Sequence, residues 1–243
     1  MKKYVLVFLI FRRINCDIIA FMKKELELQP KIIAENNEKT TMRETLFVPE
    51  HTDRGERLLD LSSRLLRDRV IFLIDPIDSI VAKQICAQLL ILQNDHATKE
   101  IFLYINNCPG GEVYAALCIL DFMRRLSCPI HTLCAGLVAS AAVIIAACGQ
   151  RGHRYALPSA RIMMHQPHGG AKGQATDIEI QVREILLLKK YMAEILSERC
   201  QKKLEELMPM MERDYYMSAQ EAVELGIVDE VLGGTFDKSV GTI

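Results

Sequence analysis

Short apolar runs alternate with longer segments of helical periodicity between about residues 56 and 232, and this alternation most limits the folds open to the chain. Residues 70–74 and 101–105 have the length and the aliphatic content of buried strands. Residues 129–135, 161–164 and 227–232 are less uniform, and we expect strands there as well. Strands that alternate with helices in this way usually form a largely parallel sheet, so the sequence predicts an α/β fold.

Polar residues at the start of several segments mark where helices begin. Asp78 precedes apolar residues at helical spacing, so we expect it to cap a helix. The sequence TDIE at 176–179 has the pattern of a capping box and predicts a long helix that runs to about Arg199. SAQE at 218–221 repeats the pattern and predicts a short helix that ends at Gly226.

The chain shows no internal repeat and no Pro/Gly/Ser-rich linker after residue 56, which favours one domain. We expect this domain to span 46–234, with a poorly ordered N-terminal extension over 1–45 and a tail over 235–243. The apolar run at 4–11 is too short to span a bilayer, and no small-residue cleavage site follows it. We therefore expect no membrane segment.

Charge and cysteine content exclude several classes of function. The chain has 30 Lys and Arg against 31 Asp and Glu, a formal net charge of −1, and no tryptophan. This balance argues against a nucleic-acid-binding protein. None of the eight cysteines forms a CxxC pair, and no histidine lies at zinc-ligand spacing from a cysteine pair, so we expect reduced thiols and no metal site.

The stretch CAGLVASAAVIIAACG at 134–149 is small and apolar apart from one hydroxyl, that of Ser140. A serine in such a run is commonly packed in the core, with its hydroxyl bonded to a main-chain carbonyl. A second interpretation follows from its place after a strand and at the start of a helix. Unsatisfied N–H groups and the positive end of the helix dipole there favour an oxyanion, so Ser140 is also a candidate nucleophile.

Three further features can complete such a site. His165 follows the strand at 161–164 and can act as a general base, or can simply bond to a turn carbonyl. Asp214 can orient the histidine, or can be a solvated charge at a helix end. Gly110 and Gly111 can bring main-chain N–H groups close to an oxyanion, or can form a plain turn.

Several motifs together resemble the proteolytic subunit of the Clp protease family, over residues 46 to 232 or so. They are YIN and PGG within 104–111, GLVAS at 136–140, GHRYALP at 152–158, MMHQPHGGAKGQATDIEI at 163–180 and ERDYYMSAQEAVELGIVDEVL at 212–232. The resemblance implies a ClpP/crotonase-like fold, a repeated ββα spiral in a single domain. Residues 166–175 and the helix after them would form an extended handle.

The resemblance also implies a role for each site residue. Ser140 becomes the nucleophile, His165 the general base and Asp214 the residue that orients the base. The main-chain N–H groups of Gly111 and Ala141 would form the oxyanion hole. The implied activity is that of an ATP-dependent Clp protease subunit, a serine endopeptidase that hydrolyses unfolded proteins and peptides.

Partners follow from the same resemblance. Members of the family assemble as two stacked seven-membered rings around a chamber, which implies a homo-oligomer. An AAA+ unfoldase of the ClpX, ClpA or ClpC type would feed unfolded protein into the chamber. That partner would use the ATP, and we expect no cofactor in this chain, which has no GxxxxGK[ST] phosphate loop. The implied location is the cytoplasm or an organelle of bacterial descent, and residues 1–45 would be a propeptide cleaved near 43–47.

The chain departs from the family pattern near the expected site. YINNCPGG has one residue more than the usual YINSPGG, with Cys108 in place of the serine. Ala141 and Ala142 replace the usual Met-Gly, and Arg125 replaces an aromatic residue of the unfoldase-docking pocket. The inserted residue and the two alanines keep open a second function, that of a catalytically weak or inactive structural subunit of a mixed ring. A third, an acyl-CoA enzyme of the crotonase type, would need a pair of catalytic carboxylates, which we do not find in the sequence.

Overall fold

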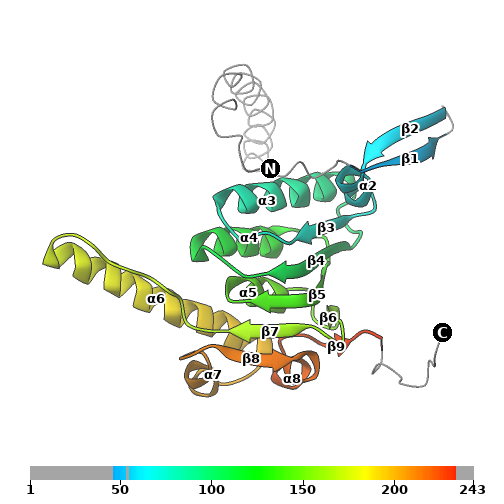
Figure 1. Cartoon of the computed structure of the whole chain (residues 1–243). Helices are drawn as coiled ribbons and strands as arrows, with labels where there is room; N and C mark the ends of the chain where they lie inside the picture. The colour runs from blue at the N-terminus through cyan, green and yellow to red at the C-terminus, as the bar shows by residue number, and fades with distance from the viewer. Residues whose placement is uncertain (1–45, 53–54, 234–243) are drawn as a thin grey trace, which may run out of the picture. The chain divides into compact units, whose positions relative to one another are not determined.

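The computed structural model describes residues 46–52 and 55–233 (Figure 1). The predictions for 1–45 and 235–243 lie outside the described residues. The strands are β1 (Phe47–Thr52), β2 (Gly55–Asp60), β3 (Val70–Leu73), β4 (Ile101–Cys108), β5 (Ile130–Ala139), β6 (Arg154–Ala156), β7 (Arg161–Met164), β8 (Tyr215–Ser218) and β9 (Glu230–Val231). The helices are α2 (Leu61–Arg67), α3 (Ser79–Asp95), α4 (Val113–Arg125), α5 (Ala141–Ala147), α6 (Ala175–Cys200), α7 (Leu204–Met210) and α8 (Ala219–Leu225).

Seven of the strands form one sheet. Its order is β3-β4-β5-β6-β9, and β7 pairs with β5 on one side and with β8 on the other. All of these pairs are parallel except β7–β8, which is antiparallel. β1 and β2 form a separate antiparallel hairpin. The mostly parallel sheet with helices between its strands confirms the predicted α/β fold.

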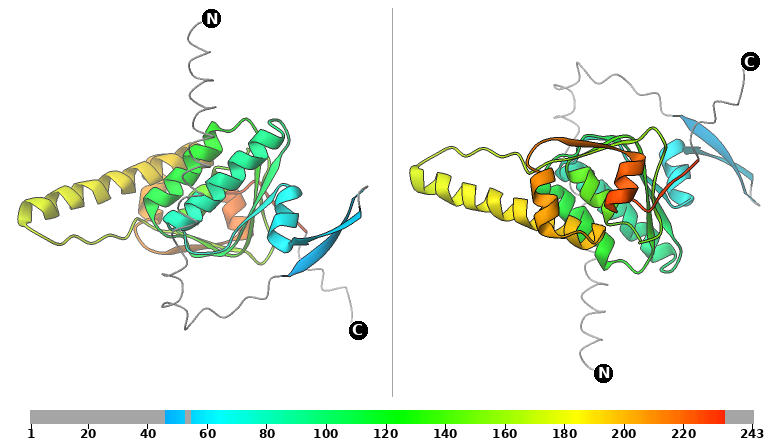
Figure 2. Two further views of the ribbon diagram at one scale, coloured as in Figure 1. Left: turned by 90° about the horizontal axis from the view of Figure 1, so that it is seen from above. Right: turned by 90° about the horizontal axis from the view of Figure 1, so that it is seen from below.

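The helices take two kinds of position. α3 and α4 lie side by side over the sheet, while α6 extends beyond it with the preceding segment running alongside (Figure 2). This extension matches the expected handle. None of the helices in the described part of the chain is both long enough and apolar enough to cross a membrane.

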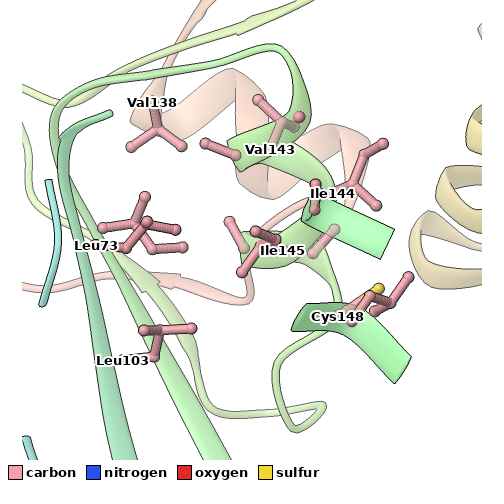
Figure 3. Packing of buried hydrophobic residues seen from close by; sticks show 14 of the residues in the cluster. Leu73, Leu103, Val138, Val143, Ile144, Ile145 and Cys148 are labelled. Carbon is pink, nitrogen blue, oxygen red and sulfur yellow. The ribbon is translucent and has the colours of Figure 1, made fainter. Parts of the chain in front are cut away.

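The short helix α5 is enclosed by the core. All seven of its residues are buried, and Figure 3 shows Val143, Ile144 and Ile145 among side chains from the sheet. Leu73 and Leu103 of the neighbouring strands are fully buried in the same cluster. Burial of one such aliphatic side chain contributes about 2 kcal/mol. The start of α5, directly after Ser140, is therefore held by packing on every side.

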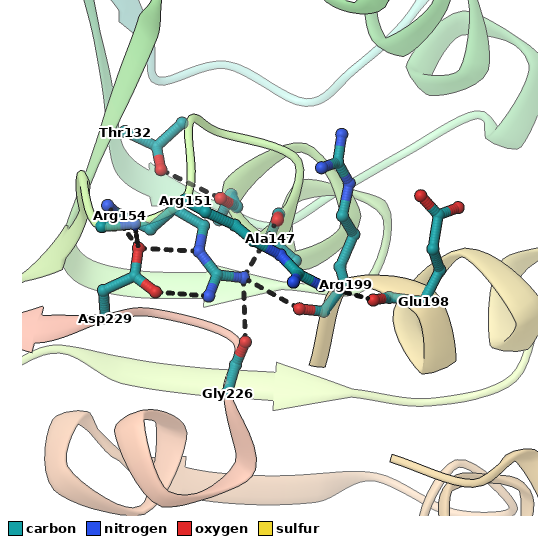
Figure 4. A network of polar contacts seen from close by, with 10 residues as sticks. Thr132, Ala147, Arg151, Arg154, Glu198, Arg199, Gly226 and Asp229 are labelled. Atoms are coloured by element: carbon teal, nitrogen blue, oxygen red, sulfur yellow. Dashed lines mark hydrogen bonds and ion pairs between the residues drawn. The ribbon is translucent and has the colours of Figure 1, made fainter. Parts of the chain in front are cut away.

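A buried arginine ties β6 to the C-terminal part of the sheet. The Arg154 side chain is 5% exposed and forms an ion pair with Asp229 at 2.5 Å (Figure 4). Its Nη1 also donates to the carbonyls of Ala147 and Gly226, at 3.2 and 2.9 Å. Burial raises the pKa of Asp229, but hydrogen bonds from Arg154 outweigh it and hold that pKa below its usual value. Because Ala147 is the last residue of α5, the network fixes that helix from its C-terminal end.

The helix caps follow the sequence with one exception. Asp78 accepts hydrogen bonds from the N–H groups of Ile80 and Val81, as predicted. The capping box of Ser218 and Glu221 is present, and the helix ends at Gly226. The capping box predicted at 176–179 is wrong: α6 begins at Ala175, its N-cap is Gln174, and no side chain caps it. Helical backbone starts one residue before Thr176, so that side chain belongs to the first turn instead of preceding it.

The bounds of the strands differ more from the prediction than the helix caps do. The strand predicted at 129–135 runs on to Ala139, and the one at 227–232 shrinks to Glu230–Val231. The prediction at 161–164 matches β7. β1, β2, β6 and β8 were not predicted. β6 has only three residues, which is too short for an alternating pattern to be visible.

Candidate active site

Ser140 occupies the tight turn between β5 and α5, in a backbone conformation that is rare for a serine. Its φ is +56° and its ψ is −126°. Its N–H donates to Met163 O at 2.7 Å, and its carbonyl accepts from Val143 N at 3.0 Å. A positive φ at a residue with a Cβ costs on the order of 1–3 kcal/mol and persists only where the surroundings impose it. The buried helix and the neighbouring strand β7 impose it here.

His165 and Asp214 are brought opposite each other by the pairing of β7 with β8. The antiparallel register pairs Met164 with Tyr215. Continuing that register by one residue in each direction sets His165 against Asp214. Strand β7 also lies parallel to β5, with Ala139 paired to Met163. The carboxyl ends of β5 and β7 therefore deliver Ser140 and His165 to the same edge of the sheet.

The three side chains form a continuous series of hydrogen bonds. Ser140 Oγ lies 2.8 Å from His165 Nε2, and His165 Nδ1 lies 3.0 Å from Asp214 Oδ1. The His165 side chain is 11% exposed, whereas that of Asp214 is 55% exposed. The hydroxyl of Ser140 and the imidazole of His165 therefore bond to side chains and not to main-chain carbonyls, while Asp214 is both solvent-exposed and hydrogen-bonded to His165. Their catalytic roles stay predictions.

The segments that carry His165 and Asp214 are fastened to each other. Gln166 N donates to Met211 O at 2.6 Å, and Gln166 Nε2 donates to Glu212 O at 2.9 Å. Lys189 Nζ of α6 lies 2.8 Å from Glu212 Oε2, and this hydrogen bond is the main reason why the pKa of Glu212 is lowered. The same segments line a cavity of about 370 Å³ beside the imidazole. The imidazole is thus held in place while one side of it stays open.

The glycine turn lies directly behind Ser140. A Cβ at Gly110 would lie 2.7 Å from Ser140 Cβ and 2.9 Å from Ala141 N, so only glycine allows this approach. The turn is held by Ile77, whose N–H donates to Gly110 O at 2.8 Å and whose carbonyl accepts from Glu112 N at 2.7 Å. Among the described residues, the N–H of Gly111 has no acceptor. The structure therefore brings the turn to Ser140, and the roles of Gly111 and Ala141 as oxyanion donors stay predictions.

The residue that makes this turn longer than usual coincides with an irregularity between β4 and β5. Pairing is regular from Ile101 to Asn106, then Cys108 pairs with Val138, so that one residue of β4 faces two of β5. Asn107 has a φ of +51° and its side-chain oxygen accepts from Leu137 N at 3.0 Å. The side chain thus replaces a missing main-chain acceptor. An isolated glycine within a strand, here Gly136, was the sequence signal for this bulge.

A sequence model of the Clp protease family matches residues 53–235 of the chain. The chain belongs to the Clp protease family. The matched span contains every element of the site, from the glycine turn to Asp214. The expected ClpP/crotonase-like fold is confirmed, and the chain is a peptidase of the ClpP kind, a hydrolase that acts in proteolysis. The family forms oligomeric rings.

Proposed function

We propose that this Clp protease chain is a catalytically active serine endopeptidase subunit. The observation that carries the proposal is the hydrogen-bonded order Asp214–His165–Ser140, at 3.0 and 2.8 Å. A serine hydroxyl is a weak nucleophile unless a base takes its proton, and the base must hold the correct tautomer. Both requirements are supported by the same two contacts.

Each residue has one task in the proposed reaction. Ser140 Oγ attacks the peptide carbonyl while His165 Nε2 takes the hydroxyl proton, and the imidazolium then gives that proton to the leaving amine. Asp214 accepts the Nδ1–H bond throughout, which keeps Nε2 free to act as the base. The N–H groups of Gly111 and Ala141 donate to the carbonyl oxygen as it becomes negative. In the second half of the reaction His165 Nε2 takes a proton from a water molecule, which attacks the acyl carbonyl. The imidazolium then returns that proton to Ser140 Oγ, and the acid product leaves.

We further propose that the substrates are unfolded polypeptides and that the active form is two stacked heptameric rings. Large apolar side chains on α6 support an assembly through that helix, since they stay exposed in the single chain: Ile178, Ile180, Val182, Leu186 and Leu187. An AAA+ unfoldase would use the ATP, and this chain would need no cofactor. Arg125 lies exposed in the last turn of α4, where docking would meet a charge instead of an aromatic ring. We place the complex in the cytoplasm or in an organelle of bacterial descent.

The test is labelling of the assembled protein with a serine-directed fluorophosphonate, read by intact mass. Wild type should gain one adduct per chain and Ser140→Ala none. Ser62→Ala, which changes an exposed serine of α2, is the matched control and should label like wild type. Absence of an adduct on an assembled wild-type ring would overturn the proposal. That result would favour an inactive structural subunit, the alternative suggested by the replacement of the usual Met-Gly by Ala141 and Ala142.

A further inference from the structure

A second histidine lies beside the His165–Asp214 pair and takes no part in the proposed reaction. The imidazole of His168 lies 4.3 Å from that of His165 between ring centres, with the planes inclined at 66°. One donor atom from each of His165, His168 and Asp214 falls within 4.8 Å of the other two. His168 and Asp214 are exposed, and His165 is half-buried. Two imidazoles and a carboxylate at one place form a typical donor set for a transition-metal ion.

The distance between the two donor atoms already in contact suits a tetrahedral ion. Zinc binds imidazole nitrogen and carboxylate oxygen at about 2.0–2.2 Å, so two of its ligands lie about 3.3 Å apart. His165 Nδ1 and Asp214 Oδ1 are 3.0 Å apart, with a single proton between them. Replacing that proton by a zinc ion requires the separation of these two atoms to increase by about 0.3 Å. Because the His168 side chain is exposed, it can turn to supply a third ligand.

The surroundings leave room for the ion and for its fourth ligand. All three residues line the cavity of about 370 Å³, and Ser140 is not among its lining residues. The nearby carboxylate of Glu212 is already paired with Lys189 at 2.8 Å. A water molecule can therefore complete the tetrahedron, as is usual for a site with three protein ligands.

We propose that His165, His168 and Asp214 bind Zn²⁺ and that the bound ion reversibly switches Ser140 off. A zinc ion on Nδ1 leaves the neutral imidazole with its one proton on Nε2. In that form Nε2 donates a hydrogen bond to Ser140 Oγ and cannot take the hydroxyl proton. No proton is lost from the ring, since it moves from Nδ1 to Nε2 through solvent. The inhibitory half of this inference rests on the function proposed for Ser140, whereas the binding half does not.

The sequence analysis missed this site because it considered only histidines near cysteine pairs. The signal in the sequence is HQPH at 165–168, in which two histidines are three residues apart. The third ligand comes from a segment 49 residues away from His165. Only the pairing of β7 with β8 brings it into reach.

The first experiment measures binding without reference to activity. Co²⁺ is added to the assembled metal-free protein as a zinc substitute, and the visible absorption of a tetrahedral Co²⁺ centre is recorded, followed by competition with Zn²⁺. Wild type should show one site per chain. His168→Leu should bind at least about 100-fold more weakly, since loss of even an outer contact costs 10- to 100-fold. His96→Leu removes an exposed histidine at the end of α3 and should bind like wild type.

The second experiment measures the rate of fluorophosphonate labelling at buffered free Zn²⁺, with each variant compared with its own zinc-free rate. Wild type and His96→Leu should slow at least about 10-fold at saturation and recover on addition of a chelator. His168→Leu should keep its zinc-free rate at the same zinc concentration. If wild type binds no Co²⁺, or if His168→Leu binds as tightly as wild type, the inference is wrong. If metal-free wild type is never labelled, the proposed function fails, while the Co²⁺ titration still decides whether the metal site exists.

Discussion

Replacing Gly110 by alanine tests whether the glycine turn holds Ser140 in its reactive position. Gly110 is buried and has a φ of +86°. Its added Cβ would lie 2.6 Å from Ala139 O and 2.9 Å from Ala141 N, whereas ordinary contacts begin at 3.4 Å. The turn and the main chain on both sides of Ser140 must therefore separate by about 0.8 Å. Neither side can yield easily, because Ile77 holds the turn and the buried helix α5 holds the serine.

Two effects of this substitution have different sizes and different readouts. The left-handed backbone conformation costs an alanine about 1–2 kcal/mol relative to glycine, which lowers the free energy of unfolding. A displacement of nearly 1 Å at the nucleophile costs about 100-fold in rate. We therefore expect Gly110→Ala to label with fluorophosphonate about 100 times more slowly than wild type, on protein that still assembles.

Gly152→Ala is the matched control, because it adds the same strain without the contact. Gly152 has a φ of +80°, and a Cβ there would meet nothing within 4 Å. Chemical denaturation should show a loss of about 1–2 kcal/mol for this variant, and its labelling rate should equal that of wild type. The reasoning fails if Gly110→Ala labels as fast as wild type, or if Gly152→Ala slows labelling to the same extent.

Three further predictions concern the charged network, the base and the thiols. Asp214→Asn should slow labelling about 10³- to 10⁴-fold with little change in unfolding, because the amide no longer selects the tautomer of the base. Asp229→Asn leaves Arg154 buried without its partner and should cost about 3 kcal/mol by denaturation at neutral pH. Folding lowers the pKa of Asp229, so its carboxylate adds to the free energy of unfolding above about pH 4, and this stabilisation is lost as the pH falls through the pKa of the folded protein. The Asn variant should lack this acid-dependent loss of stability. Iodoacetamide at pH 8 should modify the exposed Cys118 before the other cysteines of the described residues and leave Cys134, whose pKa burial raises to about 12; early labelling of Cys134 would contradict the burial argument.

The parts of the fold that the sequence predicted correctly are those with a local cause. Asp78 and Ser218 cap their helices through hydrogen bonds within three residues, so a short pattern contains all the information. The pattern at Thr176 looks the same, but helical backbone begins at Ala175 and the threonine has no free turn to cap. The two cases differ in the residue at which helical backbone begins. The path of the preceding chain sets that residue, and a four-residue pattern does not contain this information.

The candidate site was less predictable because it depends on long-range pairing. His165 and Asp214 are 49 residues apart and meet only through β8, a strand that was not predicted. Taken singly, each residue was explained at least as well by a structural role as by a catalytic one. The resemblance to the Clp protease family supplied the combination, and the sheet register supplies its physical reason.

Several of the unusual backbone conformations among the described residues lie where the chemistry is proposed, whereas others, such as those of Arg69 and Gln201, lie elsewhere. Asn107, Gly110, Gly136 and Ser140 have φ values of +51°, +86°, +62° and +56°, and all lie in the carboxyl-terminal halves of β4 and β5 or within two residues after them. At Ser140, which carries a Cβ, this conformation is strained and persists only where the surroundings over-determine it, which is what the buried residues of α5 provide. The apolar stretch around Ser140 therefore supports the strained turn rigidly and also excludes water from one side of it. On this argument the change from Met-Gly to two alanines leaves the N–H of Ala141 in place, because that donor belongs to the main chain and its position is set by the helix.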